Sequence, residues 1–410
     1  MKATIGLLIL FFLKLSTHAR TIVTCPECPI KSVHEAYDLA QNCDSIIIKK
    51  GQYQIDNLIV KKQIAILGYE NPRLISKSGG EILTIASNNV SVSGIIFKGV
   101  KTNFLKENAA IHILKVKDFE ISNNVFEECF FGIYVEKGKR GSIQGNNIYG
   151  NAKVEADSGN GIHAWYCDSL EIYNNNIRGH RDGIYFEFVN NSKIYNNRSF
   201  ENLRYGLHFM FSNDDQYTRN TFENNGVGVA VMFSRRIKML ENIFIRNWGH
   251  AAYGLLLKEI YDAEIIKNTF KENTVGVFVE GSNRINYQRN DFIRNGYAIK
   301  FSGGCESNRI SYNNFLHNSL DMLVSSKLLD NSLSQNYWSE YAGYDLDKNG
   351  NGDIPYYPVK LYSYILNQVP ESVVLMRSLF VEIVNFSEKI SPQFTPKDVF
   401  DASPKMTINQ

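Results

Sequence analysis

The feature that most constrains this chain is a repeat of about 22 residues. A large apolar residue, usually preceded by Asn, recurs through most of the sequence, and seven of the nine intervals between copies are 22 or 23 residues. The two longer intervals, of 28 and 26 residues, carry insertions. The copies are Phe126, Tyr149, Ile177, Phe200, Phe222, Phe244, Phe270, Phe292, Phe315 and Tyr337. A fixed period of this size indicates a solenoid, in which each repeat packs on its neighbours.

The repeating unit is made of strands. Apolar residues alternate in twos, not at offsets of three and four, and they lie beside Asn and Gly, which disfavour helices. The chain has 44 Asn and 29 Gly. We therefore predict an all-β fold, a right-handed parallel β-helix with rungs of about 22 residues stacked roughly 4.8 Å apart. Pairs such as Asn123-Asn124, Asn146-Asn147 and Asn313-Asn314 are expected to stack as amide ladders, with the large apolar residues inside.

Both ends of the coil need caps, and the N-terminus carries an export signal. Lys2, an apolar run from Ile5 to Leu13 and small residues before Ala19 are typical of a secretory signal peptide; an uncleaved tether is the alternative. The predicted organisation is a signal peptide at 1–19, an N-terminal cap at 20–58, the β-helix at 59–343, an Asp-rich turn at 344–358 and a C-terminal helical extension at 359–410.

The charge balance argues against nucleic acid or anionic lipid as the principal partner. Cleavage after residue 19 removes Lys2 and Lys14 from the 44 basic residues and removes no acid, which leaves 42 basic residues against 42 acidic ones. A chain without formal net charge has no electrostatic footprint for a polyanion. We expect a soluble, exported protein.

Period-two alternation predicts an outward face rich in sulfur and aromatic rings. Met210 and Met232 fall in register on adjacent rungs, with His208 two residues away along the strand. Thioether and imidazole ligands favour Cu(I), so these residues and His163 are copper candidates. The alternative is a metal-free protein-binding patch. The expected partner surface consists of Tyr134, Trp165, Tyr185, Glu187, Leu256 and Phe278.

Two further motifs suggest metals or a disulfide. Cys25 and Cys28 form a CxxC pair near Cys43; a Cu(I) or Zn(II) site is one reading, and a disulfide is favoured in an oxidising compartment. The Asp-rich turn places oxygen ligands at the spacing of a calcium loop, but Tyr356 stands where the bidentate Glu belongs. The candidate ligands of a structural calcium ion are Asp345, Asp347, Asn349, Asn351 and Asp353. A metal-free Asx turn is the alternative.

Little in the sequence indicates that the protein is a catalyst. Gly179-His180, Asp214-Asp215 and Arg236-Ile237-Lys238 resemble pieces of the polygalacturonase signature, but their order is wrong and the Asn-Thr-Asp piece is absent. We therefore predict that the protein is not an enzyme. A β-helix that binds or modifies polysaccharides, as a lyase, hydrolase or epimerase, remains the alternative.

Specific segments resemble the NosD family. They are Tyr205-Gly-Leu-His-Phe-Met-Phe-Ser212, Gly228-Val-Ala-Val-Met-Phe-Ser-Arg-Arg236, and the stretches from Asn336 to Asp347, Asp353 to Tyr356 and Val369 to Phe380. The resemblance implies a periplasmic accessory protein in copper-centre maturation of nitrous oxide reductase. Implied partners are an ABC-type ATPase and its membrane permease, a copper-chaperone lipoprotein and the apo-reductase.

The resemblance also bears on the C-terminal segment. An amphipathic run from Pro370 to Ile390 either caps the last rung or docks onto the membrane partner. For the second reading the expected contacts are Leu375, Leu379, Phe380 and Ile383. Carried over to this chain, the family role makes His208, Met210 and Met232 the residues through which copper passes.

Overall fold

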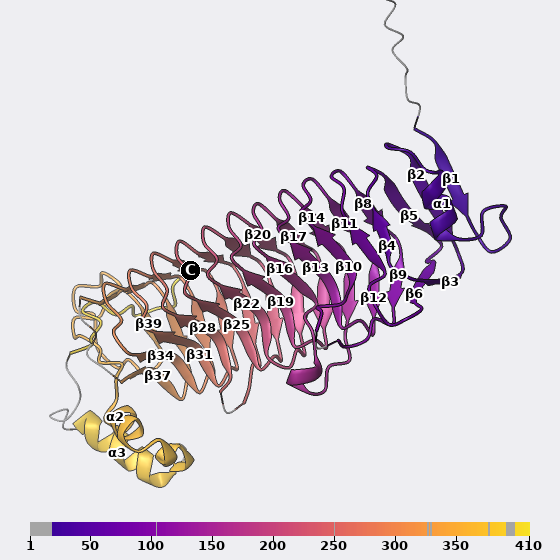
Figure 1. The fold of residues 1–410 in the computed structure, drawn as a ribbon. Coiled ribbons are helices and arrows are strands. Elements are labelled where there is room, and N and C mark those ends of the chain that lie inside the picture. The colour runs from indigo at the N-terminus through magenta and orange to yellow at the C-terminus, as the bar shows by residue number, and fades with distance from the viewer. Residues whose placement is uncertain are drawn as a thin grey trace, which may run out of the picture.

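The structure is a computed structural model that describes residues 19–103, 105–249, 251–325, 328, 330–375, 378–390 and 398–410. Apart from Ala19, the predicted signal peptide lies outside these residues. The chain winds into a long coil with three parallel sheets along its length, a cap at the N-terminal end and two helices beside the C-terminal end (Figure 1). The prediction of a parallel β-helix is confirmed.

Sheet A contains 14 strands in the described part of the chain, each hydrogen-bonded to the equivalent strand of the next rung. Its strands are β1 (Thr21–Thr24), β2 (Ser45–Lys49), β5 (Ala65–Tyr69), β8 (Ser91–Ser93), β11 (Glu120–Ser122), β14 (Ser142–Gln144), β17 (Glu171–Tyr173), β20 (Lys193–Tyr195), β23 (Gln216–Thr218), β26 (Lys238–Leu240), β29 (Glu264–Ile266), β32 (Asn286–Gln288), β35 (Arg309–Ser311) and β38 (Ser332–Ser334). Because β1 and β2 belong to this sheet, the predicted cap already contributes strands to the coil.

Sheet B follows sheet A within each rung and contains 13 strands among the described residues. They are β3 (Gln52–Ile55), β6 (Arg73–Ser76), β9 (Ile96–Lys98), β12 (Val125–Glu127), β15 (Asn147–Tyr149), β18 (Asn176–Arg178), β21 (Arg198–Phe200), β24 (Thr221–Glu223), β27 (Ile243–Ile245), β30 (Thr269–Lys271), β33 (Asp291–Ile293), β36 (Asn314–Leu316) and β39 (Tyr337–Trp338).

Sheet C carries the longest strands and the predicted outward face, and 12 of its strands lie in the described ranges. They are β4 (Leu58–Val60), β7 (Leu83–Ile85), β10 (Ala109–Leu114), β13 (Phe131–Glu136), β16 (Ile162–Trp165), β19 (Asp182–Glu187), β22 (Tyr205–Met210), β25 (Val227–Met232), β28 (Tyr253–Lys258), β31 (Val275–Glu280), β34 (Tyr297–Ser302) and β37 (Leu320–Val324). The residues that alternate with this outward face point inward, since Ile184, Leu207 and Val229 pair across rungs and are fully buried.

Buried asparagines join the rungs between sheets A and B. In a repeating pattern, each Asn side chain donates to the amide oxygen of the next Asn and to a backbone carbonyl, as Asn220 does to Asn242 at 3.0 Å and to Ile194 at 2.9 Å. The ladder runs through Asn124, Asn146, Asn175, Asn197, Asn220, Asn242, Asn268, Asn290, Asn313 and Asn336. This confirms the predicted amide ladder.

A second ladder, which the sequence analysis missed, lies between sheets B and C. It consists of Asn202, Asn225, Asn247, Asn273, Asn295 and Asn318, with side-chain contacts between most neighbours. The signal was present in the sequence, because an Asn stands three residues after Phe222, Phe244 and Phe270. The two ladders fix two of the three corners of the rung.

The prediction of large apolar residues stacked inside the coil is confirmed, but it selects the wrong residue in three rungs. Phe222, Phe244, Phe270, Phe292 and Phe315 stack with ring centroids between 4.6 and 5.5 Å apart. However, the inward residues of the other rungs are Ile148, Ser199 and Trp338, not the neighbouring Tyr149, Phe200 and Tyr337. The inward position is the second residue after the ladder Asn, and at these rungs it is adjacent to the aromatic residue that the prediction selected.

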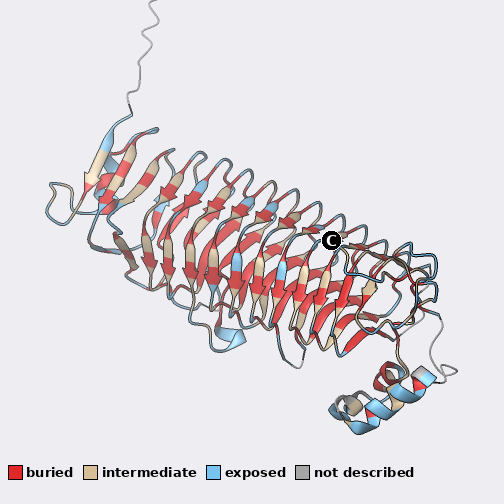
Figure 2. Cartoon of the chain, turned by 180° about the vertical axis from the view of Figure 1, so that it is seen from behind, coloured by how far each residue is buried: buried red, intermediate tan, exposed pale blue. Residues whose placement is uncertain are grey.

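The N-terminal end is closed by a short helix, α1 (Val33–Leu39), which lies within the predicted cap. The Ser32 hydroxyl accepts a hydrogen bond from the Glu35 amide at 3.0 Å and caps its first turn. Val33 and Ala36 face the core, so α1 covers the open end of the first rung. The buried residues run as stripes inside the coil from this cap to the last rung (Figure 2).

The C-terminal helices lie beside the coil and do not cap its last rung. The 3₁₀ helix η2 (Pro370–Leu375) separates α2 (Leu361–Gln368) from α3 (Leu379–Ile390), and the pair packs through Tyr362, Leu366 and Val381 on the outward side of β37. Trp338, Tyr356 and Val399 complete the end of the core instead. Of the described helices, not one has the length and apolar character needed to cross a bilayer.

The Asn ladder predicts a large cost for a small truncation. In an Asn220→Ala variant, the Ile194 carbonyl and the backbone amide of Asn197 lose their buried partners, and the Asn197 side-chain amide loses one of its acceptors. Each buried group left unpaired costs roughly 1–3 kcal/mol, so we expect the free energy of unfolding to fall by about 3 kcal/mol. Guanidinium unfolding measures it. The exposed Asn151→Ala variant should change it by less than about 0.5 kcal/mol, and an equal loss in both variants would contradict the argument.

Candidate copper-binding and partner face

Five rings form a continuous column on the outward side of sheet C. They come from consecutive strands β10, β13, β16, β19 and β22 and are His112, Tyr134, His163, Tyr185 and His208. Neighbouring ring centroids lie 4.7–4.9 Å apart, which is the rung spacing of a parallel sheet. Tyr134 is the first residue of this column in the predicted surface, and His112 is absent from that prediction. The apolar Ile111 and Ile113 on either side of His112 indicate the same outward position.

His208 lies at the end of this column against a buried carboxylate. Its side chain is 8% exposed, its Nδ1 is 3.9 Å from Asp182 Oδ2, and neither ring nitrogen has a hydrogen-bond partner among the described residues. Asp182 is fully buried. Burial alone would raise the pKa of this carboxyl, but interactions with His208 and Arg204 hold the pKa below its ordinary value.

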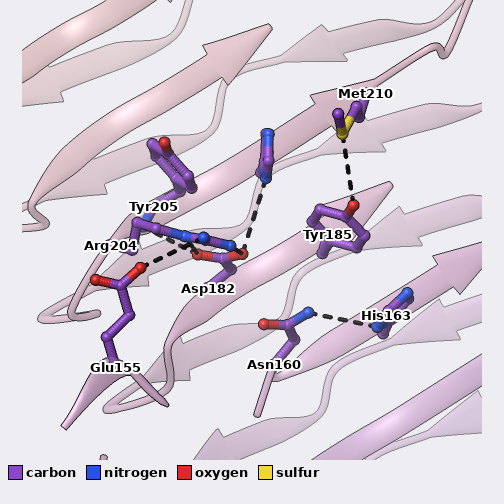
Figure 3. A network of polar contacts seen from close by, with 9 residues as sticks. Glu155, Asn160, His163, Asp182, Tyr185, Arg204, Tyr205 and Met210 are labelled. Carbon is purple, nitrogen blue, oxygen red and sulfur yellow. Dashed lines mark hydrogen bonds and ion pairs between the residues drawn. The ribbon is translucent and has the colours of Figure 1, made fainter. Parts of the chain in front are cut away.

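Arg204 connects this carboxylate to the inserted turn. Its guanidinium donates two hydrogen bonds to Asp182, at 2.9 and 2.6 Å, and lies 3.4 Å from Glu155 (Figure 3). Glu155 begins the 3₁₀ turn η1 (Glu155–Asp157), which lies within the longest interval of the repeat. Metal-binding histidines are commonly oriented by a carboxylate at the second ring nitrogen. The charged group at Asp182 is therefore placed to orient His208.

Met210 and Met232 are partners across adjacent rungs, as the repeat predicts. Both side chains are half-buried, and the Tyr185 hydroxyl donates to the Met210 sulfur at 3.7 Å (Figure 3). Met232 packs on a small apolar cluster of Val227, Ala230 and Leu256, outside the main core. The structure thus brings two thioethers onto one half-exposed strip of sheet C, with His208 on the same strand as Met210.

His163 is less accessible than its outward direction suggests. It is 5% exposed, and its Nδ1 lies 3.4 Å from the Asn160 side-chain amide (Figure 3). Burial, together with the nearby Arg181, lowers its pKa to about 3. Its imidazole is neutral at physiological pH, which is the form that binds metals.

The remaining predicted surface residues lie on the same face with different exposure. Trp165, Tyr185, Glu187 and Phe278 are half-buried, whereas Tyr134 and Leu256 are buried. Tyr134 is covered by stacking on His112 and by contact with Phe131 and His163. Simple alternation predicts direction and not exposure, because large rings on successive rungs cover one another.

The other predicted metal motifs lie far from this face in the sequence. Cys25 and Cys28 form a disulfide, and Cys43 is a free, exposed thiol. In the Asp-rich turn, Asp345 accepts the Asn349 and Gly350 amides at 3.1 and 2.8 Å, and Asp353 accepts the Leu346 amide at 2.7 Å. Across the described residues, no group of three or more His, Cys, Asp or Glu side chains is placed to hold a metal ion. Calcium binding by this turn stays a prediction.

The fold places the chain among the parallel β-helix proteins. Solved structures with the same architecture include a PL6 alginate lyase in complex with a trisaccharide, at a TM-score of 0.62 and 12% identity over 78% of this chain and 85% of that one. Another is the catalytic unit of a GH87 α-1,3-glucanase from Streptomyces thermodiastaticus, at a TM-score of 0.56 and 11% identity over 74% and 65%. At such low identity these likenesses establish the fold alone.

Sequence comparison finds similarity to one family. The model of NosD, described as a periplasmic copper-binding protein, matches residues 145–344. A probable ABC transporter binding protein NosD from Stutzerimonas stutzeri is 27% identical over 81% of this chain and 80% of its own length. A protein of the same description from Pseudomonas aeruginosa is 30% identical over 27% of this chain and 26% of that one. The chain is thus similar to NosD proteins over most of its length.

The Asp182–Arg204 pair makes a prediction about the stability of the face. Replacing Arg204 with Met leaves the buried Asp182 carboxylate without its cation, which costs about 3–5 kcal/mol in the free energy of unfolding. The matched control is Arg140→Met. Arg140 binds Asp118 through two hydrogen bonds of 2.8 Å, but both side chains are exposed, so the expected cost is below about 1 kcal/mol. Equal losses by denaturant titration would show that Asp182 does not depend on Arg204.

Proposed function

We propose that this protein accepts and passes on Cu(I) in the periplasm during assembly of the copper centres of nitrous oxide reductase. The proposed partners are an ABC-type ATPase with its membrane permease, a copper-chaperone lipoprotein and the apo-reductase. In this role the chain is a non-catalytic binding subunit. Similarity to NosD supports the role, because the family model describes a periplasmic copper-binding protein and a relative is named a probable ABC transporter binding protein.

The observation that carries the proposal is the register of Met210 and Met232. Two thioethers on adjacent parallel strands lie one rung apart, about 4.8 Å between backbones, which is within the span of two ligands on one ion. Both are soft ligands that favour Cu(I) over the harder divalent ions. A half-exposed position suits exchange, since a partner can reach the sulfurs directly.

The membrane partner is proposed to bind α3. The side of this helix that faces away from the coil is apolar, with Leu379 71% exposed and Ile383 54% exposed. Phe380, Phe386 and Ile390 are also exposed, and Leu375 continues the surface just before the helix. An exposed apolar surface of this kind marks an interaction site. The inner side of the helix is already occupied, since Val381 packs on the coil-bound cluster.

A Met210→Leu, Met232→Leu double variant tests the copper site. Leucine conserves volume but removes sulfur, so the fold is expected to persist while the affinity for Cu(I) falls roughly tenfold or more. Competition with a chromophoric Cu(I) chelator measures the affinity. Met239→Leu is the matched control, since Met239 is fully buried in sheet A and should leave the affinity unchanged. Wild-type affinity in the double variant would exclude the two thioethers as ligands.

A Leu379→Asp variant tests the membrane docking surface. A carboxylate in an apolar interface loses its hydration, so co-purification with the permease and ATPase should fall at least about tenfold. Asn151→Asp, which adds the same charge at an exposed position of the coil, is the control and should retain binding. Because Leu379 is largely exposed, the free energy of unfolding should change by less than about 0.5 kcal/mol. Full retention of the complex by Leu379→Asp would move the docking surface elsewhere.

A further inference from the structure

Four aromatic residues beside the methionines occupy an unfavourable backbone conformation. At the corner between sheets C and A, Tyr166, Phe188, Phe211 and Phe233 have φ values of 53°, 54°, 52° and 53°. Bulky residues rarely adopt this left-handed conformation. Tyr166, Phe211 and Phe233 are 48%, 38% and 40% exposed. We call these four residues the aromatic strip.

The corner itself does not require aromatic residues. The equivalent positions of the flanking rungs are Lys115, Lys137, Glu259 and Gly281, which have the same backbone conformation and the same inter-rung hydrogen bonds. Polar residues or glycine therefore satisfy the fold at this corner. The aromatic strip is confined to the four rungs around Met210 and Met232, and Phe211 and Phe233 directly follow these two residues in the chain.

Stacking within the strip determines which part of each ring a partner can reach. Successive centroids are 4.5, 5.2 and 5.1 Å apart, with interplanar angles of 23°, 9° and 16°. The ring faces are therefore largely covered by their neighbours, and the edges point outward. Cations and nucleic-acid bases are recognised by ring faces, so the strip is poorly suited to them. Ring edges favour contact with the sulfur of methionine and with other apolar side chains.

A cleft follows the last ring of the strip. It has a volume of about 370 Å³ and is lined by Phe211, Phe233, Arg235, Glu259 and Tyr261, among others. Neighbouring corner residues are paired, as in Arg236 with Asp214 and Arg284 with Asp262. Arg235 and Glu259 form no ion pair with any described residue, although the Arg235 charge helps to lower the pKa of Asp214 and Asp262 nearby. Both side chains line the cleft and can contact a side chain that a partner inserts into it.

We propose that the aromatic strip and its cleft are the docking site for a folded, Cu(I)-carrying protein that presents methionine side chains to the ring edges. This inference rests on the proposed function, since it places the partner beside the thioethers that receive the ion. A protein seated on Phe211 and Phe233 lies next to Met210 and Met232 because these residues are consecutive in the chain. The partner's soft ligands and those of the coil would then face each other during transfer.

A Phe211→Asn, Phe233→Asn double variant tests the docking site. Asparagine tolerates the left-handed conformation, so the rings are removed without new backbone strain. The probe is the Cu(I)-loaded copper-chaperone lipoprotein without its lipid, mixed with the full chain. We expect the rate of Cu(I) transfer at limiting concentration to fall at least about tenfold. The Cu(I) affinity of the variant alone should stay within about twofold of wild type, because the thioethers remain.

The matched control removes a stacked aromatic pair elsewhere. Tyr173 and Tyr195 stack at 4.7 Å on sheet A, so a Tyr173→Thr, Tyr195→Thr variant should transfer copper at the wild-type rate. Wild-type transfer by the Phe211, Phe233 variant would overturn the docking site. If the Met210, Met232 variant keeps its Cu(I) affinity but the Asn variant binds the chaperone less tightly by calorimetry, the copper site is wrong and the docking surface stands. Retained binding in both assays overturns both proposals.

Discussion

The stacked amides of buried asparagines are the interaction on which the rest of the molecule depends. Each Asn inside the ladder pairs its amide with the same residue at the same position of the next rung, and the Asp401 carboxylate takes that place for the last one, Asn336. A one-residue slip would bury unpaired amides and turn every side chain of a strand to the opposite face. The register of the outward columns, including the alignment of Met210 with Met232, therefore follows from a requirement of the interior.

The sequence alone predicts the coil well because its period, its asparagines and its alternation act at short range. It predicts less well which large apolar residue of each rung points inward. The choice of Tyr149 and Phe200 follows from the expectation that the largest residue is inside. The inward position is instead the second residue after the ladder Asn, which is Ile148 in one rung and Ser199 in the other. The C-terminal run was also assigned as a possible cap. Leu320 and Leu323 instead form an apolar patch on the side of the coil, and the helices cover that patch.

The candidate site was only partly foreseeable for a similar reason. His208, Met210 and Met232 follow from alternation along the strand. Asp182 and Arg204 do not, since their pairing depends on the corner between sheets B and C, where the chain departs from period two. The aromatic strip lies at another such corner. Its residues look like ordinary strand ends in the sequence, and only the backbone conformation shows that their side chains turn outward.

The chain enters and leaves the helical segment at a single point of the coil. Tyr356 and Asp401 exchange backbone hydrogen bonds of 2.9 and 2.8 Å, and the Asp401 carboxylate also holds Asn336 and Trp338 of the last rung. The helical segment is thus joined to the coil by hydrogen-bonded backbone at Tyr356 and at Asp401, in addition to its packing on β37. A force applied to α3 would reach the coil through both of these connections. The coil would therefore move as one rigid body before its last rung separated from the others.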